Sequence, residues 1–424
     1  MGETAIRPSD ESQATESQSR DKKKDEVLDH HVENFDQPLA NILRRVVAEH
    51  GKSLSSQIGE LARLCVRGNK ITASEYYDNC LFDDKTYSMD EKRRFIGELK
   101  SVEIGRLSQI RSHHSAIIAD KVIFEKTMTG FGIPVPQTLA LVSDVYPGHS
   151  TNKLESAEGL HEFLASTEMP VFGKPLGTAR SLGTTRIDGY DAKTRTVRLS
   201  SGTEASVERI WKSLKDKRFK GYLLQRTISA HPDFQGLAGG GLPTVRCVVI
   251  DRGNGPELWR GAAKLPAKGN VADNFWRQGN MLCAVDVETG ALGPALTDVG
   301  IDGEFISHHP DTGRPIEGVE LPFWHEGVSL MKDVARLLPD IKLFGFDTTF
   351  TADGPLIVEV NPGPQLSFMQ LAHRKGVMDE AMVELVAHCT QLRKDMGNEA
   401  RDRNKRRVKA QHERVHKQVT QRAA

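Results

Sequence analysis

Two carboxylates and an amide stand on two consecutive segments that read as a β-hairpin. Asp347 lies on the first strand, and Glu359 and Asn361 lie on the second. Because side chains alternate along a strand, Glu359 and Asn361 share one face, while Val358 and Val360 share the other, apolar face. Strand pairing brings Asp347 beside Glu359, where two carboxylates repel each other unless a cation lies between them. Hard oxygen ligands suit Mg²⁺, so these three residues are predicted metal ligands; the alternative is the polar face of an edge hairpin.

A lysine followed by a loop of glycine and hydroxyl residues forms a second group. Lys174 ends an apolar strand, and the loop after it carries Gly177, Ser181 and Gly183. Backbone N–H groups of such a loop can turn toward phosphate oxygens while the lysine supplies a point charge. The lysine precedes the glycines, so this is not a Walker-type P-loop. By itself, the segment equally suits an ordinary connection between two strands.

Polar side chains also follow or interrupt two other apolar strands. The strand 222–228 ends in polar residues that could contact an adenine edge and a ribose, although a core strand explains it equally well. Arg246 lies inside an apolar strand, Lys264 lies on the next strand, and Asn274 and Arg277 lie in the following loop. An arginine in a strand can simply face solvent. Several cations and amides beside a metal site would instead bind phosphate or carboxylate groups.

A sheet-rich scaffold must position these residues. Short apolar segments bounded by turn residues predict strands at 170–174, 184–188, 196–199, 222–228, 244–251, 257–264, 280–287, 344–350 and 356–360. Amphipathic helices are expected at 323–338 and from about 378 to 392. Antiparallel strands with segregated helices are typical of an α+β fold.

The two ends of the chain differ from this central part. Residues 1–34 are polar and poor in large apolar side chains, which predicts disorder. Residues 35–118 have helical periodicity, and Ser88 followed by Glu91 predicts a capping box. The tail 393–424 carries 11 Lys or Arg against 4 Asp or Glu. It is expected to be a solvated helix or a disordered extension, and binding to an acidic partner is the alternative.

Composition narrows the class of protein. The chain has 424 residues, of which 38% are hydrophobic, so two or three domains with a sizeable core are expected. The formal net charge is zero, so no global feature indicates nucleic-acid binding. No segment approaches the length of a membrane span, and the start lacks the apolar stretch of a signal peptide. Five dispersed cysteines indicate reduced thiols in a cytoplasmic protein.

Taken in order, the motifs resemble the ATP-grasp superfamily over residues 119–375. The most specific element is the Asp347 to Asn361 hairpin, with its Glu-x-Asn-Pro ending. The segment 120–126, followed by Gly-Ile-Pro-Val-Pro at 132–136, resembles the opening helix of the family. Within the superfamily, 70–97 and 273–276 are most similar to the sugar-transfer-associated branch. The resemblance implies two α+β subdomains that grip ATP, here at 119–392, behind a helical N-terminal region.

Residue roles follow from this resemblance. Lys121 and Lys174 would contact the nucleotide phosphates, with Lys264 as a further phosphate contact, and the loop 177–184 would be a lid over them. Gln225, Arg226 and Ile228 would form the adenine-contacting hinge, and His231 would lie near the ribose. One departure concerns Gly345, because relatives of the D-alanine–D-alanine ligase type have an arginine two residues before the first metal aspartate. Arg246 is the first candidate for the missing charge, and Arg277 is the next.

The implied reaction is ATP- and Mg²⁺-dependent ligation of a carboxylate to a nucleophile, most often an amine, through an acyl phosphate. Two metal ions are expected, with Mn²⁺ able to replace Mg²⁺. Two alternatives remain open. One is a kinase-like phosphotransferase on the same fold, and the other is a non-catalytic nucleotide-binding scaffold whose basic tail recruits a partner.

Overall fold

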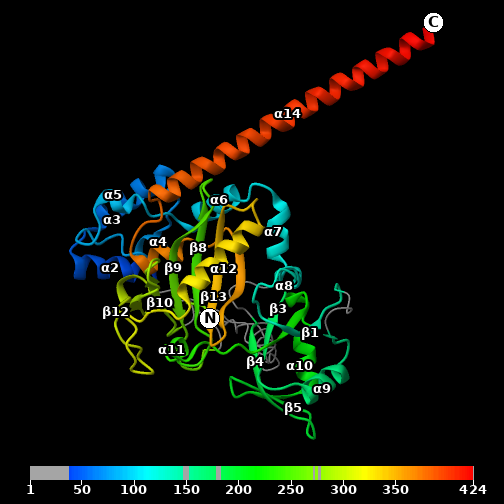
Figure 1. Ribbon diagram of the computed structural model, residues 1–424. Helices are drawn as coiled ribbons and strands as arrows, with labels where there is room; N and C mark the ends of the chain where they lie inside the picture. The colour runs from blue at the N-terminus through cyan, green and yellow to red at the C-terminus, as the bar shows by residue number, and fades with distance from the viewer. Residues whose placement is uncertain (1–37, 147–151, 178–182, 271–272, 276–277, 424) are drawn as a thin grey trace, which may run out of the picture.

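The computed structural model describes residues 38–146, 152–177, 183–270, 273–275 and 278–423. Within them lie two seven-stranded sheets, a cluster of N-terminal helices and a long C-terminal helix (Figure 1). The α+β class predicted from the sequence is confirmed. The predicted disordered segment 1–34 lies outside the described residues.

The first sheet is antiparallel except where β1 and β2 pair in parallel. In spatial order it consists of β2 (Asn152–Lys153), β1 (Thr138–Val142), β7 (Tyr222–Arg226), β3 (Val171–Pro175), β4 (Thr185–Asp191), β5 (Thr196–Leu199) and β6 (Glu204–Ser206). Helices α9 (Ala157–Ser166) and α10 (Val207–Leu214) pack against it, and the 3₁₀ turn η2 (Lys217–Phe219) precedes β7. Sequence periodicity predicted β3, β4, β5 and β7 but missed β1 and both helices.

The second sheet is antiparallel throughout and has a core on each face. Its order is β12 (Phe305–Ile306), β11 (Leu292–Leu296), β10 (Met281–Val285), β9 (Pro256–Leu265), β8 (Thr244–Asp251), β13 (Leu343–Thr351) and β14 (Gly354–Pro362). Along β8, Val245, Cys247 and Val249 enter one core, while Val248 and Ile250 enter the other. A strand covered on both faces reads as a continuous apolar run, which explains the sequence of β8 and makes Arg246 an exception.

Helices cover both faces of this second sheet. Helix α12 (Trp324–Leu337) packs on one face, and α13 (Ser367–His373) with the start of α14 (Glu380–Ala423) packs on the other. The short helices α11 (Pro232–Gln235) and η3 (Gly300–Asp302) lie in its loops. Each fully buried side chain such as Phe346 or Leu343 contributes roughly 1.5–3 kcal/mol. The two-sided burial therefore makes β8 and β13 a rigid support for the polar residues Arg246 and Asp347 that they carry.

The first N-terminal helices share a core of their own, whereas Ile104, Ile118 and Phe124 of the later ones pack into the cores of the second sheet. The N-terminal helices are α2 (Leu39–His50), α3 (Leu54–Leu64), the π-turn η1 (Cys65–Asn69), α4 (Ala73–Asp78), α5 (Met89–Lys92), α6 (Glu98–Ser108), α7 (Ser112–Ala119) and α8 (Lys121–Gly130). The predicted capping box at Ser88 and Glu91 is confirmed. Gln370 of α13 bonds both the N–H and the carbonyl of Ile96, at 2.8 and 2.9 Å. Gly105 of α6 contacts Gly363, at φ +87°, so closely that a Cβ on either glycine would collide with the other.

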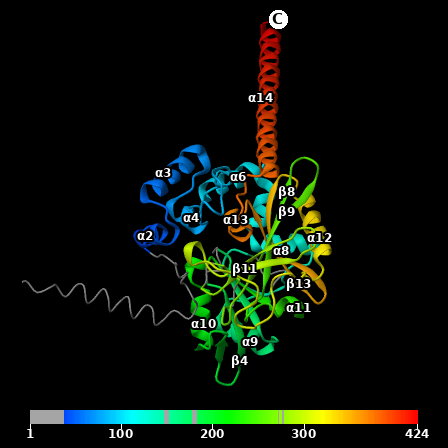
Figure 2. The same ribbon diagram turned by 90° about the vertical axis from the view of Figure 1, so that its left-hand side faces the viewer.

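Helix α14 begins against the second sheet and then extends far from the rest of the chain (Figures 1 and 2). Arg393 marks the change, because its guanidinium donates to the carbonyls of Arg106, Leu107 and Gln109 at the end of α6. These carbonyls lack helical partners, so a cation satisfies them well. Of the two forms expected for the tail, the structure has the helix, which continues to Ala423.

The helices and the cysteines bear on two expectations from the sequence. No helix in the described part is long and apolar enough to cross a membrane. All five cysteines are free thiols; Cys247, Cys283 and Cys389 are buried, whereas Cys65 is exposed.

Candidate functional site

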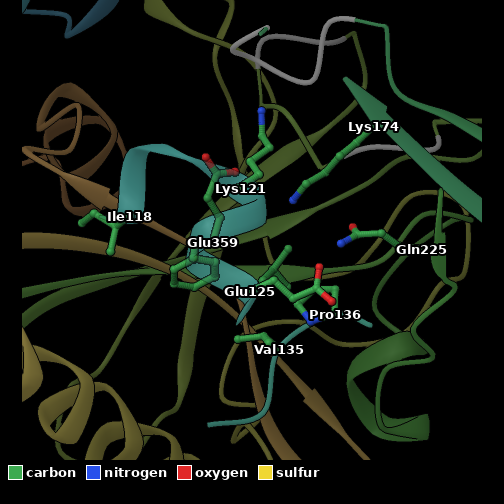
Figure 3. Close-up of a pocket in the computed structure, with 10 residues that line it drawn as sticks. Ile118, Lys121, Glu125, Val135, Pro136, Lys174, Gln225 and Glu359 are labelled. Carbon is green, nitrogen blue, oxygen red and sulfur yellow. The ribbon is translucent and has the colours of Figure 1, made fainter. Parts of the chain in front are cut away.

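A pocket lies between the two sheets, where α8, β3, β7 and β14 meet. Lys121 and Glu359 extend into it side by side, and Lys174 and Gln225 point toward them from the first sheet (Figure 3). The remaining walls are Ile118, Phe124, Glu125, Val135, Pro136 and Val358. Four residues that the sequence singled out from four separate segments are therefore brought together.

The two lysines give this pocket a positive end. Asp120 caps α8 by accepting from the N–H groups of Val122 and Ile123, each at 3.0 Å, and so fixes Lys121 in the first turn. The Lys121 ammonium donates to the carbonyl of Pro175 at 3.0 Å, just beyond Lys174. Burial lowers the pKa of Lys121; Glu359 opposes this shift and Lys174 adds to it. Two converging ammonium groups favour an anion with several oxygens, such as a polyphosphate.

The other end of the pocket is a chain of hydrogen bonds that orients an amide. Glu125, which is buried, accepts from the N–H of Thr138 at 2.9 Å and from its hydroxyl. Gln225 Nε2 in turn donates to the Thr138 hydroxyl at 3.3 Å. Because Gln225 uses its NH₂ group in this way, its carbonyl oxygen remains as the acceptor for a ligand.

The hairpin that carries Asp347, Glu359 and Asn361 forms in the predicted register, with one irregularity. Asp347 pairs directly with Glu359, and Gly345 pairs with Asn361. The register shifts between Asp347 and Thr348, so the second strand has a bulge next to Glu359. The bulge interrupts the alternation, and Val358 lines the pocket together with Glu359 instead of sharing the core face of Val360. The expectation that Val358 and Val360 share one apolar face was wrong for this reason.

Protein cations lie beside the Asp347 carboxylate. Arg246 binds it with a fork, Nε to Oδ1 at 2.6 Å and Nη2 to Oδ2 at 2.8 Å, and Lys264 Nζ lies 3.1 Å from Oδ1. Burial would raise the pKa of Asp347, but Arg246 and then Lys264 outweigh it and hold that pKa well below its usual range. Burial likewise opposes the charge of Lys264, and Asp273 followed by Asp347 raises its pKa. The predicted repulsion between the two carboxylates therefore does not by itself require a metal, because Arg246 and Lys264 supply positive charge there.

The alternative of a solvent-facing Arg246 is also wrong. Its side chain is 16% exposed and lies on the same face of the sheet as Asp347, its direct cross-strand partner. A Cβ on Gly345 would lie 2.5 Å from Pro364 and 3.4 Å from the Arg246 side chain. No side chain fits at position 345, and Arg246 occupies part of the space above it.

The oxygen ligands remaining at the hairpin still fit a divalent cation. Glu359 makes no hydrogen bond or ion pair with the residues that the structure describes, and it lies across from Asp347. Asn361 follows on the same strand. Mg²⁺ needs only one or two carboxylates besides water and phosphate oxygens. Glu359 and Asn361 can supply ligands directly, whereas Asp347 would first exchange its contact with Lys264.

The predicted loop residues are Gly177, Ser181 and Gly183. Gly177 and Gly183 flank residues 178–182, which include Ser181 and lie outside the described residues. A Cβ at Gly177 would collide with Lys220, and one at Gly183, where φ is +77°, with Phe219. Gly183 therefore requires glycine on steric and backbone grounds, whereas a side chain at position 177 would first have to displace the exposed Lys220.

The remaining predicted contacts do not line the pocket. Arg226 is exposed and bonds Gln137 at 3.2 Å, and Ile228 lies beyond the end of β7. His231 accepts from the N–H of Asp233 at the start of α11, and its ring contacts Phe323. Asn274 is buried in the loop after β9, where Asn280 binds its carbonyl; Arg277 lies outside the described residues.

Sequence reasoning missed Glu125, Thr138 and Asp273. Glu125 is four residues after Lys121, so it falls on the same face of α8, and this spacing was an available signal. Thr138 binds Gln225, which is 87 residues away, and Asp273 binds Lys264 on the preceding strand. The sequence offers no periodic signal for either contact.

Comparison with protein families matches residues 107–384 to the family described as sugar-transfer associated ATP-grasp. A search of curated proteins finds no match. Among solved structures, a D-alanine–D-alanine ligase from Coxiella burnetii is 12% identical, with a TM-score of 0.39, over 69% of this chain and 64% of that one. A D-alanine–D-alanine ligase from Bacillus anthracis is 13% identical, with a TM-score of 0.37, over 67% of this chain and 71% of that one. An ADP complex of an N5-carboxyaminoimidazole ribonucleotide synthetase is 13% identical, with a TM-score of 0.35, over 61% of this chain and 48% of that one. The match thus spans less than two thirds of the Coxiella ligase.

Proposed function

Because the chain belongs to the sugar-transfer-associated ATP-grasp family, we propose that it uses ATP and Mg²⁺ to activate a carboxylate as an acyl phosphate and join it to an amine. Its fold is the ATP-grasp fold, with the nucleotide site between two α+β subdomains. The observation that supports the proposal most is the convergence of Lys121, Lys174, Gln225 and Glu359 on one pocket. A positive end, an oriented amide acceptor and a free carboxylate suit the phosphates, the nucleobase and a metal ion, respectively.

Each residue of the site has a role in this proposal. Lys121 and Lys174 bind the phosphates, and the Gln225 carbonyl accepts a hydrogen bond from the nucleobase. Asp347, Glu359 and Asn361 hold the divalent cation, which would stabilise negative charge on the phosphates. Arg246 and Lys264, which carboxylates already hold in place, are preorganised beside the position proposed for the γ-phosphate.

The chemistry has two balanced steps. A substrate carboxylate oxygen attacks the γ-phosphorus, the bond to the bridging oxygen breaks, and ADP leaves. An amine nitrogen then attacks the acyl carbon, inorganic phosphate leaves, and the amine loses one proton. The loop 177–184 would exclude water from the acyl phosphate between the two steps.

Gly345 keeps the phosphotransferase alternative open, because the arginine of ligases of the D-alanine–D-alanine type is absent there. In that alternative a hydroxyl takes the phosphoryl group and no phosphate is released. A screen of carboxylates paired with amines, with ADP and inorganic phosphate measured together, distinguishes the two. Equal release of both supports the ligase, ADP with a phosphorylated product supports the phosphotransferase, and ATP binding without any turnover supports a scaffold.

The proposed reaction indicates the chemical class of the substrates and partners. The acceptor and donor are small molecules, and the protein is proposed to act in the cytoplasm. The projecting part of α14 is proposed to remain solvated or to bind an acidic partner through its excess of basic residues.

A further inference from the structure

Asp273 is a partly buried carboxylate that the proposed reaction does not use. It lies in the loop between β9 and β10, with its side chain 16% exposed. The two residues that follow it anchor the loop: Asn280 donates to the carbonyl of Asn274 at 2.7 Å, and Phe275 packs edge-on against Phe368 of α13. The Thr244 hydroxyl also donates to Asp273 Oδ2. A loop aspartate is thus fixed in place inside a charged site.

The contact that matters is with Lys264. Its ammonium lies 2.8 Å from Asp273 Oδ2 and 3.1 Å from Asp347 Oδ1, so one cation is shared by two carboxylates. Lys264 is 5% exposed, and a buried ammonium without a carboxylate partner is strongly disfavoured. If a metal ion took the Asp347 oxygen, Lys264 would need another acceptor or would have to leave the cleft.

We propose that Asp273 is a positioning residue that retains the Lys264 ammonium beside the cleft when a divalent cation takes Asp347 Oδ1. The inference rests on the proposed function, because it assumes metal binding at the hairpin. Its basis is that the shorter of the two Lys264 contacts is already made to Asp273. Arg246 and Lys264 face three carboxylates, those of Asp273, Asp347 and Glu359, and Glu359 also lies beside the Lys121 ammonium.

The test measures metal binding by Asp273→Asn. The melting temperature is followed as MgCl₂ is titrated into protein with a fixed concentration of a non-hydrolysable ATP analogue, because ligand binding to the folded state raises it. In the variant, Lys264 keeps Asp347 as its sole carboxylate and competes with Mg²⁺. The Mg²⁺ midpoint is expected to rise about tenfold, the scale of one charge-assisted contact.

Loss of a nearby negative charge alone would also weaken Mg²⁺ binding, so the same change is made in a Lys264→Met background. Without the ammonium, Asp273→Asn is expected to change the midpoint by less than about twofold, because coupled residues are non-additive. An equal rise in both backgrounds would overturn the proposal, as would no rise in either.

Two further variants complete the design. Asp311→Asn is the matched control, because Asp311 accepts from the N–H of Lys268 in the same loop and is expected to leave the midpoint unchanged. Thr244→Val removes the hydroxyl that holds Asp273 and is expected to raise the midpoint about threefold; it decides the matter if Asp273→Asn does not fold. An unchanged Thr244→Val midpoint in that case refutes the role of Asp273. If the wild-type protein shows no shift with analogue and Mg²⁺, the proposed function fails instead.

Discussion

Replacing Arg246 by methionine removes the guanidinium that holds both carboxylate oxygens of Asp347. The fork consists of two short charge-assisted bonds, at 2.6 and 2.8 Å, in a site where both side chains are at most 16% exposed. Breaking one partner of a buried ion pair typically costs about 3–5 kcal/mol. Lys264 still contacts Asp347 at 3.1 Å, so we expect a loss near the lower end, about 3 kcal/mol. Arg246→Lys keeps the charge but not the fork, and should lose about 1.5 kcal/mol.

Urea denaturation followed by tryptophan fluorescence measures this loss, because Trp259 on β9 and Trp324 on α12 both report on the second sheet. The matched control is Arg336→Met. Arg336 pairs with Asp333 at 2.6 Å, but more than half of each side chain is exposed, so the change should stay within about 0.5 kcal/mol.

The pH dependence has a definite sign. The pKa of Asp347 is lowered in the folded state, so its stabilisation is present above the unfolded-state pKa of about 3.9 and is lost as the pH falls through the folded value. The difference between wild type and Arg246→Met should be complete at pH 7 and shrink below about pH 4. A difference at pH 7 no larger than that of Arg336→Met would refute the reasoning.

In steady-state assays, Arg246→Lys should keep ATP affinity and lower the chemical rate about a hundredfold or more; near-wild-type turnover would remove Arg246 from the site.

Three other predictions test the pocket and the chain ends. Glu359→Gln should abolish turnover and leave the melting temperature nearly unchanged, because it removes charge but little volume at a position without an ion pair among the described residues; turnover at saturating Mg²⁺ would exclude Glu359 as a ligand. Lys174→Ala should remove most of the rise in melting temperature caused by ATP and Mg²⁺, whereas Lys212→Ala, at an exposed position on α10, should keep it. Deleting residues 1–34 should leave ATP binding and thermal stability unchanged within error, and a large loss of folded protein would contradict the assignment of that segment as disordered.

Local chemistry determined much of what the sequence revealed. Alternation and turn residues predicted β8, β9, β13 and β14, because a hairpin joins neighbours across a few residues and its pattern is repeated in each strand. The pairing of Asp347 with Glu359 followed from the same short turn. Strand β1 and helices α9 and α10 were missed, although Ser156 and Ser206 cap the two helices and their buried residues fall on one helical face, which are local signals.

Only the tertiary structure decided which charges neutralise each other. Sequence spacing placed Asp347 beside Glu359 and suggested a metal between them, but Arg246 comes from a strand 101 residues away. The bulge that places Val358 in the pocket is a feature of how β13 and β14 pair, and no residue type in either strand predicted it. Likewise, Asp273 meets Lys264 only because the fold brings the loop that carries it next to β9. Electrostatic and steric fit between segments far apart in the chain is a property of the folded arrangement, and the sequence of any one segment does not contain it.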